Sequence, residues 1–176
     1  DLHSFPTRRS SDLKARSIQS LNENIKSGTD VSTFQFHFDG RLLSICSNHS
    51  APGTDYTGFI TLSKYIFDKL GRVTSIQKQF GSNALKTIST YDYDDLGRVK
   101  TKHLDPGYVA GGNPELESLN YTFNIHNQIT GINKDYALKN PGNYNKWGHF
   151  FGLYIGFDNR DNSFGQVQLN GQVTGL

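Results

Sequence analysis

The segment YDYDDLGRVKTK, residues 91–102, decides the fold of this chain, because a near copy, YIFDKLGRVTSI, stands at residues 65–76. The copies lie 26 positions apart and share Tyr, an aromatic residue, Asp, Leu, Gly, Arg and Val in one register. A repeat at a fixed spacing indicates an array of structural units, each of which buries its apolar surface against its neighbours.

Three weaker copies extend this array. Residues 121–132, YTFNIHNQITGI, carry Asn-Gln where the stronger copies carry Gly-Arg. Residues 36–42, FHFDGRL, keep the aromatics, the Asp and the Gly-Arg-apolar triplet, and we interpret their turn as two residues shorter. A fifth unit is expected to begin at residues 154–158 and to close with residues 170–176, which echo residues 127–132.

Each copy has the pattern of a β-hairpin. Aromatic residues two apart face one side of a strand, and aromatics favour that pleated surface. The Asp-x-Leu-Gly-Arg segment supplies a turn, with a short polar side chain that bonds the backbone and a Gly free to adopt positive φ. Val73 and Ile76 then resume the strand three residues apart, an imperfect alternation that a twisted or a bulged strand accommodates. The residues to which we assign these structural roles are Tyr65, Phe67, Asp68, Gly71, Arg72, Tyr91, Tyr93, Asp94, Gly97, Arg98, Tyr121 and Phe123.

The sequence therefore predicts an all-β fold of tandem antiparallel hairpins, forming part of an extended, curved, shell-like sheet over residues 33–176. Turns are expected at residues 68–71 and 94–97. Each repeat Arg is expected to lie with its stem over an aromatic ring and its head near an Asp. Only residues 17–26 show a helical spacing of apolar residues, so residues 14–32 are predicted to be a linker or a short helix.

The tandem Tyr-x-Tyr-Asp-x-Leu-Gly-Arg-Val pattern resembles the YD repeat of the Rhs family, over about residues 34–176. Residues 131–136, 149–152 and 157–159 look like the last repeats before the Rhs core in proteins of Bacteroidetes-like bacteria. Members of this family are large secreted or surface-displayed proteins, whose repeats wind a β-sheet into a hollow shell, commonly around a toxic C-terminal domain. The chain departs from the family pattern at Asn127-Gln128 and in the shortened first copy, and it contains no core or toxin segment.

The resemblance implies a non-catalytic wall segment, secreted or at the cell surface. Its partners would be further repeats and the C-terminal domain of the same polypeptide. The alternative is a carbohydrate-binding or cell-envelope-binding module, because aromatic residues stack on sugar rings. Tyr144 and Trp147 in the loop-like residues 139–148 are candidates, although a Trp147 that folds back over the adjacent hairpin is favoured. A scaffold buries its strand aromatics between neighbouring strands, whereas a binding module leaves a row of them exposed.

The first residues have a different character. Residues 3–13, HSFPTRRSSDL, resemble the conceptual translation of a sequencing-library adapter, so residues 1–13 are predicted to add nothing to the fold. The alternative for this segment is a disordered basic arm. The absence of Met and the position of residue 176 inside a unit lead us to expect a fragment truncated at both ends.

Bulk composition limits the classes of partner. The chain has 176 residues, 18 Lys and Arg, 16 Asp and Glu, and a net charge of +2. Phosphate binding needs clustered basic residues, so nucleic acid is not expected as the main partner. No apolar run approaches the ~20 residues of a membrane span. The single Cys excludes an internal disulfide, and no cofactor motif is present.

Candidate catalytic residues are few. Cys46 with His49 could form a nucleophilic pair, but no orienting residue can be assigned, and a small buried apolar role is commoner for a free Cys. Residues 103–107, HLDPG, could place two polar groups on one strand face, although Asp-Pro-Gly indicates a turn. Asp92, Asp94 and Asp95 suggest a cation site but lack the Gly and Glu of a calcium-binding loop, so solvated, turn-capping roles are favoured.

Overall fold

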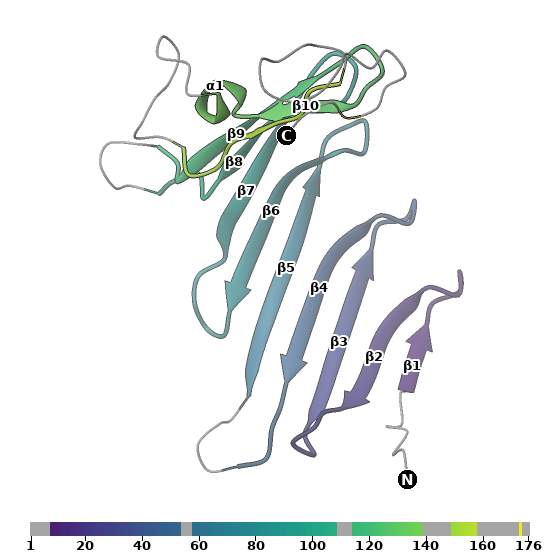
Figure 1. Ribbon diagram of the computed structural model, residues 1–176. Helices are drawn as coiled ribbons and strands as arrows, with labels where there is room; N and C mark the ends of the chain where they lie inside the picture. Colours follow the sequence, from purple (N-terminus) through teal and green to yellow (C-terminus); the bar gives the residue numbers. More distant parts are fainter. Residues whose placement is uncertain (1–7, 54–57, 109–113, 139–148, 158–172, 174–176) are drawn as a thin grey trace. The chain divides into compact units, whose positions relative to one another are not determined.

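The computed structural model describes residues 8–53, 58–108, 114–138, 149–157 and 173. The chain divides into two compact units, residues 1–88 and 89–176, and each is described by itself. In chain order the elements are β1 (Arg8–Ser11), β2 (Ser17–Glu23), β3 (Thr29–Phe36), β4 (Leu42–His49), β5 (Phe59–Phe67), β6 (Val73–Phe80), β7 (Lys86–Tyr93), β8 (Val99–Leu104), β9 (Glu117–Phe123), β10 (Ile129–Ile132), α1 (Lys134–Ala137) and β11 (Leu153–Tyr154) (Figure 1).

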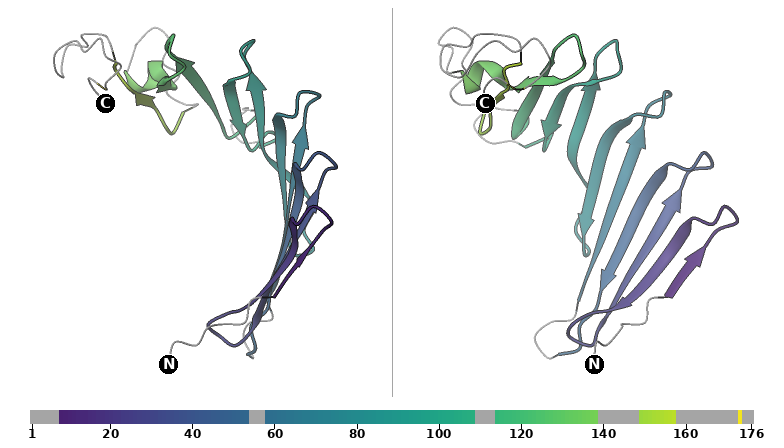
Figure 2. Two further views of the ribbon diagram at one scale, coloured as in Figure 1. Left: turned by 90° about the vertical axis from the view of Figure 1, so that its right-hand side faces the viewer. Right: turned by 45° about the vertical axis from the view of Figure 1, so that its right-hand side comes forward.

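In the first unit, strands β1 to β6 lie side by side in chain order, and each pairs antiparallel with the next (Figures 1 and 2). In the second unit, the same antiparallel pairing joins β7 to β8, β8 to β9, β9 to β10 and β10 to β11. Strand β7 begins in the last residues of the first unit. The prediction of an all-β chain built from tandem antiparallel hairpins is confirmed.

One turn design joins the strands at six places. In each turn of five residues, the first N–H donates to the fifth carbonyl, and the fourth N–H donates to the first carbonyl. The fourth residue always has positive φ, from 57° at Ser27 to 101° at Gly40. The six turns are residues 12–16, 24–28, 37–41, 68–72, 94–98 and 124–128. The turns predicted at residues 68–71 and 94–97 are confirmed.

A β-bulge next to the turn explains the apolar spacing of the repeat. Phe67 pairs with Val73, but Ile66 pairs with Ser75, so Thr74 is the extra residue. The same one-residue shift occurs in the β1–β2, β3–β4, β7–β8 and β9–β10 pairs. A turn followed by a residue at positive φ and a bulge is a common short hairpin connection. Because of the bulge, apolar residues three apart, as at positions 73 and 76, lie opposite aromatics two apart.

The helix or linker predicted over residues 14–32 is wrong. These residues form β2, the turn at 24–28 and the first part of β3. The helical spacing arose from two local features of a hairpin rather than from a helix. Ile18 is the extra residue of the β1–β2 bulge, and Ile25 lies in a turn and is 95% exposed.

The exclusion of residues 1–13 from the fold is also wrong for residues 8–13. Arg8–Ser11 forms β1, which pairs with β2, and Asp12 opens the first turn. The adapter-derived origin of residues 3–13 stays a prediction. The shortened turn in residues 36–42 is a third correction: residues 37–41 have the standard five-residue turn, with His37 in the place of the repeat Asp. The strand aromatics of that copy are therefore Phe34 and Phe36.

Burial is limited in the described residues. Ala51 is the single apolar residue classed as buried there, together with the polar Ser89, Glu117 and Asn133. The four strand aromatics Tyr65, Phe67, Tyr91 and Tyr93 are half-buried, between the scaffold and binding-module expectations. None of the helices in the described ranges is long and apolar enough to cross a membrane.

Candidate functional site

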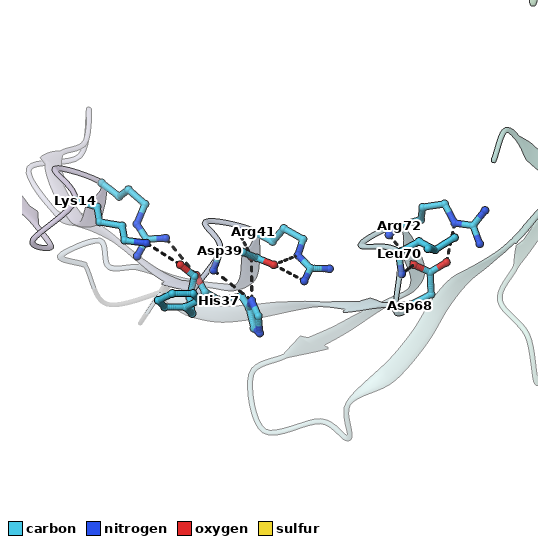
Figure 3. A network of polar contacts seen from close by, with 9 residues as sticks. Lys14, His37, Asp39, Arg41, Asp68, Leu70 and Arg72 are labelled. Carbon is cyan, nitrogen blue, oxygen red and sulfur yellow. Dashed lines mark hydrogen bonds and ion pairs between the residues drawn. The ribbon is translucent and has the colours of Figure 1, made fainter. Parts of the chain in front are cut away.

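The repeat Asp organises its turn through both carboxylate oxygens. Asp68 Oδ1 accepts hydrogen bonds from the backbone N–H groups of Leu70 (2.9 Å) and Arg72 (2.8 Å), and its Oδ2 accepts one from Arg72 Nε at 2.7 Å (Figure 3). Asp94 makes the equivalent bonds to Leu96 (3.0 Å), Arg98 N (2.8 Å) and Arg98 Nε (2.7 Å). The carboxylate thus replaces water on backbone donors that the turn leaves unpaired.

Other side chains reproduce this arrangement in part. Asn124 Oδ1 accepts the backbone N–H groups of His126 (3.0 Å) and Gln128 (2.9 Å), and Asn124 Nδ2 donates to Gln128 Oε1 at 2.8 Å. In the turn that begins with His37, the acid moves to the third position, where Asp39 Oδ2 accepts from Arg41 Nε at 2.7 Å. In both turns a side-chain hydrogen bond to the fifth turn residue, Gln128 or Arg41, is therefore retained although the residue types differ.

These contacts lower the pKa of the turn carboxyls. For Asp12 and Asp39 the largest cause is the side-chain hydrogen bond from the arginine of the same turn. For Asp68 it is the backbone N–H of Arg72. At Asp94 desolvation opposes ionisation most strongly, but the hydrogen bonds from Arg98 and the Arg98 charge outweigh it, so its pKa is also below the usual range. All four carboxyls are consequently ionised at neutral pH.

Three of the turn arginines, Arg16, Arg41 and Arg98, also reach the next hairpin. The Arg16 guanidinium lies 4.8 Å over the Phe36 ring, and its Nη1 donates to the His37 carbonyl at 3.2 Å. The Arg98 guanidinium lies 4.5 Å over the Phe123 ring, and its Nη1 donates to Asn127 Oδ1 at 3.4 Å. Arginine combines an ion pair with stacking on an aromatic face, which an ammonium group does less well.

Arg41 makes the corresponding contact in the first unit. Its guanidinium lies 5.1 Å over the Phe67 ring. The same guanidinium is ion-paired to Asp39 (Figure 3). The aromatic in each case is the last residue of the first strand of the following hairpin. We call this set of turn acid, turn arginine and following aromatic the turn ladder; its described contacts involve Asp12, Arg16, Phe36, Asp39, Arg41, Phe67, Asp68, Arg72, Asp94, Arg98 and Phe123.

The structure places the predicted repeat residues at matching register positions. Tyr65 pairs with Ile76 and Tyr91 with Lys102, each in the second pair beyond the bulge. Tyr121 pairs with Ile132 in the same way. Phe67, Tyr93 and Phe123 pair with the first strand residue after the turn, which is Val73, Val99 and Ile129 respectively. Gly71 and Gly97 are the fourth turn residues and have φ of 85° and 80°.

Sequence reasoning missed the first member of the turn ladder. Asp12 and Arg16 form an ion pair at 2.6 Å and have the same four-residue separation as Asp68 and Arg72. That separation was visible in the sequence. The interpretation of residues 1–13 as adapter-derived excludes Asp12 from the repeat, and Ala15, with a φ of 59°, takes the place of the repeat Gly.

Open, shallow grooves separate successive hairpins at the turn ladder of the first unit. One has a volume of about 380 Å³ and is lined in part by Arg41, Leu43, Tyr65 and Phe67. Another, of about 420 Å³, is lined by the residues at the same repeat positions, Arg16, Ile18, Phe34 and Phe36. Both arginines are already ion-paired within their turns.

The proposed Cys46 and His49 pair does not assemble. Both residues lie on β4, three positions apart, so their side chains project from opposite faces of the strand. Cys46 is half-buried, opposite Thr33 and Leu62 on the neighbouring strands. His49 Nδ1 contacts Asp30 Oδ1 on β3. This geometry gives Cys46 no adjacent imidazole base on its own strand face.

His103 bridges two carboxylates in the second unit. Its Nε2 lies 3.0 Å from Asp92 Oδ2 on β7, and its Nδ1 lies 2.5 Å from Glu115 Oε2, before β9. The predicted turn at residues 105–107 is confirmed, with Tyr108 N donating to the Asp105 carbonyl at 2.9 Å. Asp92 and Asp94 are thus engaged separately, by His103 and by a turn. The described residues contain no group of three or more His, Cys, Asp or Glu side chains that could hold a metal ion.

The contribution of His103 to stability is expected to depend on pH. Burial of the ring opposes protonation, but the hydrogen bonds and charges of Asp92 and Glu115 outweigh it, so the pKa of His103 is raised above 6.5. A raised folded-state pKa gives stability that is fully present below pH 6.5 and is lost as the pH rises through the folded-state value. Chemical denaturation should therefore show that, as the pH rises through this range, the free energy of unfolding falls more for the wild-type chain than for His103→Gln.

The control for this measurement is His126→Gln, a change in an exposed turn. The pH profile of that variant should match the wild-type profile. Equal slopes for His103→Gln and the wild-type chain would show that the two carboxylates do not favour the charged imidazole.

Two predicted segments lie outside the described residues: the loop 139–148 with Tyr144 and Trp147, and the closing part of the fifth unit. Comparison with known protein families and with curated proteins found no match to this chain. The resemblance to the Rhs family therefore stays a prediction, and the site is defined by its geometry.

Proposed function

We propose that this chain is a non-catalytic wall segment of a large secreted or cell-surface protein of the Rhs or YD-repeat type, in which successive hairpins form a β-shell around, or display, a C-terminal domain. The observation that supports it best is the turn ladder. The recurring Asp, Gly, Arg and aromatic residues hold the turn or contact the next hairpin. A repeat whose defining residues contact their own turn or the neighbouring hairpin is suited to forming an extended wall of stacked units.

Reading the coding sequence on both sides of this segment tests the proposal. We expect further copies of the Tyr-x-aromatic-Asp-x-x-Gly-Arg pattern upstream, and a core followed by a variable C-terminal domain downstream. Flanking sequence without such copies would contradict the assignment to a longer repeat wall.

Enzyme assays test the non-catalytic part of the proposal. The full chain, with Cys46→Ala and His103→Gln as matched variants, should show no hydrolysis of peptide, glycan or nucleic-acid substrates. Turnover that either substitution abolishes would overturn the proposal, because neither residue belongs to the turn ladder.

A carbohydrate-binding role is the second candidate, because two grooves repeat the same lining of arginine, an aliphatic residue and two aromatics. Their spacing of two strands is about 10 Å. Soluble glycans should then bind the wild-type chain and lose affinity in Tyr65→Ala. If Tyr65→Ala binds glycans as well as the wild-type chain does, or if the wild-type chain binds none, this groove is not a carbohydrate-binding site.

A further inference from the structure

The second unit leaves the hairpin pattern after β10. The chain enters the four-residue helix α1, and β11 then pairs antiparallel with β10 through Gly131 with Tyr154 and Ile132 with Leu153. Ile155 N donates to the Thr130 carbonyl at 2.9 Å. We call residues 149–155 the strap. With only two register pairs, its ladder hydrogen bonds are too few to fix it firmly.

A buried carboxylate makes the additional contacts. Glu117, the first residue of β9, is only 6% exposed. Its Oε1 accepts hydrogen bonds from the backbone N–H groups of Phe150 (2.9 Å) and Phe151 (3.1 Å) in the strap. Hydrogen bonds to a charged acceptor are stronger than neutral ones, and a buried charge that loses its donors is costly.

Asn133 connects the strap to both strands of the last hairpin. It follows β10 with a φ of 46°, and its Nδ2 donates to the Phe151 carbonyl (3.0 Å) and to Glu117 Oε1 (3.4 Å). Its Oδ1 accepts the backbone N–H of Asn120 on β9 at 2.9 Å. Asn133 is 5% exposed, so this amide is as fully enclosed as the carboxylate it supports.

The other side of the strap packs on α1. A side chain at Gly152 would come within 2.8 Å of Tyr136 Cδ1 and 2.9 Å of the Ala137 backbone nitrogen. The Tyr136 and His149 rings are 5.9 Å apart, and Lys134 Nζ lies 4.5 Å over the Tyr154 ring. The lack of a side chain at Gly152 thus allows the strap backbone to lie close to α1.

We propose that Glu117 is a latch: it holds the strap over the β10 edge, and the strap opens as a unit while the hairpins stay folded. The chemical basis is that Glu117 and Asn133 belong to the hairpin framework, whereas both backbone donors to Glu117 belong to the strap. Water can solvate the carboxylate once the strap leaves, so opening exchanges buried hydrogen bonds for hydrated ones. The open state leaves the edge of β10 without its partner strand β11.

Hydrogen exchange on the full chain tests the latch, with Glu117→Gln compared with Asp135→Asn. Gln keeps the size and one carbonyl acceptor but removes the charge; Asp135 is an exposed acid on α1 outside the network. We expect the amides of Phe150, Phe151 and Ile155 to exchange at least about tenfold faster in Glu117→Gln. The amides of the β5–β6 and β7–β8 hairpins should keep their wild-type rates in both variants.

Gly152→Ala provides a second route to the same open state without changing charge. It should accelerate the same three amides by displacing the strap from α1. If neither variant accelerates these amides beyond the Asp135→Asn rates, the latch is refuted. Equal acceleration of the hairpin amides in Glu117→Gln would also overturn it, because Glu117 would then stabilise the whole unit rather than the strap.

Discussion

Replacing Gly97 with Val is expected to lower the free energy of unfolding by about 2 kcal/mol, because a β-branched residue must adopt positive φ. Gly97 has a φ of 80° as the fourth residue of its turn, and its N–H donates to the Asp94 carbonyl at 2.9 Å. The strain is local, so the loss should arise in the β7–β8 hairpin. Denaturant unfolding of the purified chain measures it.

The matched control is Gly97→Asn, because Asn127 occupies the same turn position with a φ of 64°. Asn tolerates positive φ better than other non-glycine residues do. Gly97→Asn should therefore lower the free energy of unfolding by less than half as much as Gly97→Val. The reverse change, Ala15→Gly, should raise stability by about 0.5 kcal/mol, since relief of strain exceeds the added unfolded-state entropy. Equal losses for Val and Asn would contradict the argument from φ.

Removing the Arg98 side chain is the second change with a large expected effect. Arg98→Ala should lower the free energy of unfolding by about 1–2 kcal/mol through loss of the contact with Phe123. The same change leaves Asp94 without its side-chain donor. Arg98→Lys should recover part of the loss, because an ammonium keeps the charge but not the planar, forked geometry.

A double-mutant cycle separates the inter-hairpin contact from the rest of this effect. Arg98→Ala and Phe123→Leu, singly and together, should give a coupling energy of about 1 kcal/mol. Lys100→Ala, an exposed change in β8 just after Arg98, serves as the control and should be nearly neutral. Additive losses for Arg98 and Phe123 would mean that the stack does not join these hairpins.

The sequence predicted the hairpins where the repeat is strongest, because turn chemistry and strand alternation are local properties. Asp68, Gly71 and Arg72 lie where their residue types require, and the four-residue separation of Asp and Arg is itself a structural signal. The linker or short helix predicted over residues 14–32 failed for an equally local reason: a bulge and a turn together imitate a helical spacing in residues 17–26.

The contacts between hairpins could not be derived from the sequence. Whether Arg98 stacks on Phe123 depends on which strand follows which in the sheet, not on its own turn. The same holds for Gly28, where a Cβ would overlap the carbonyl oxygen of Ser50, more than twenty residues away. No local pattern distinguishes this Gly from one that serves a turn.

By itself, the sequence determined the antiparallel hairpins of the two strongest copies and their turns at residues 68–72 and 94–98, because hydrogen bonds within five residues and the alternation of side chains fix both. Only the tertiary structure decided that the repeat arginines connect successive hairpins, and that Glu117 meets Phe150 and Phe151 across more than thirty residues. Those contacts depend on strand register and on the path of the chain after β10, and both are set by packing between segments that are distant in the sequence.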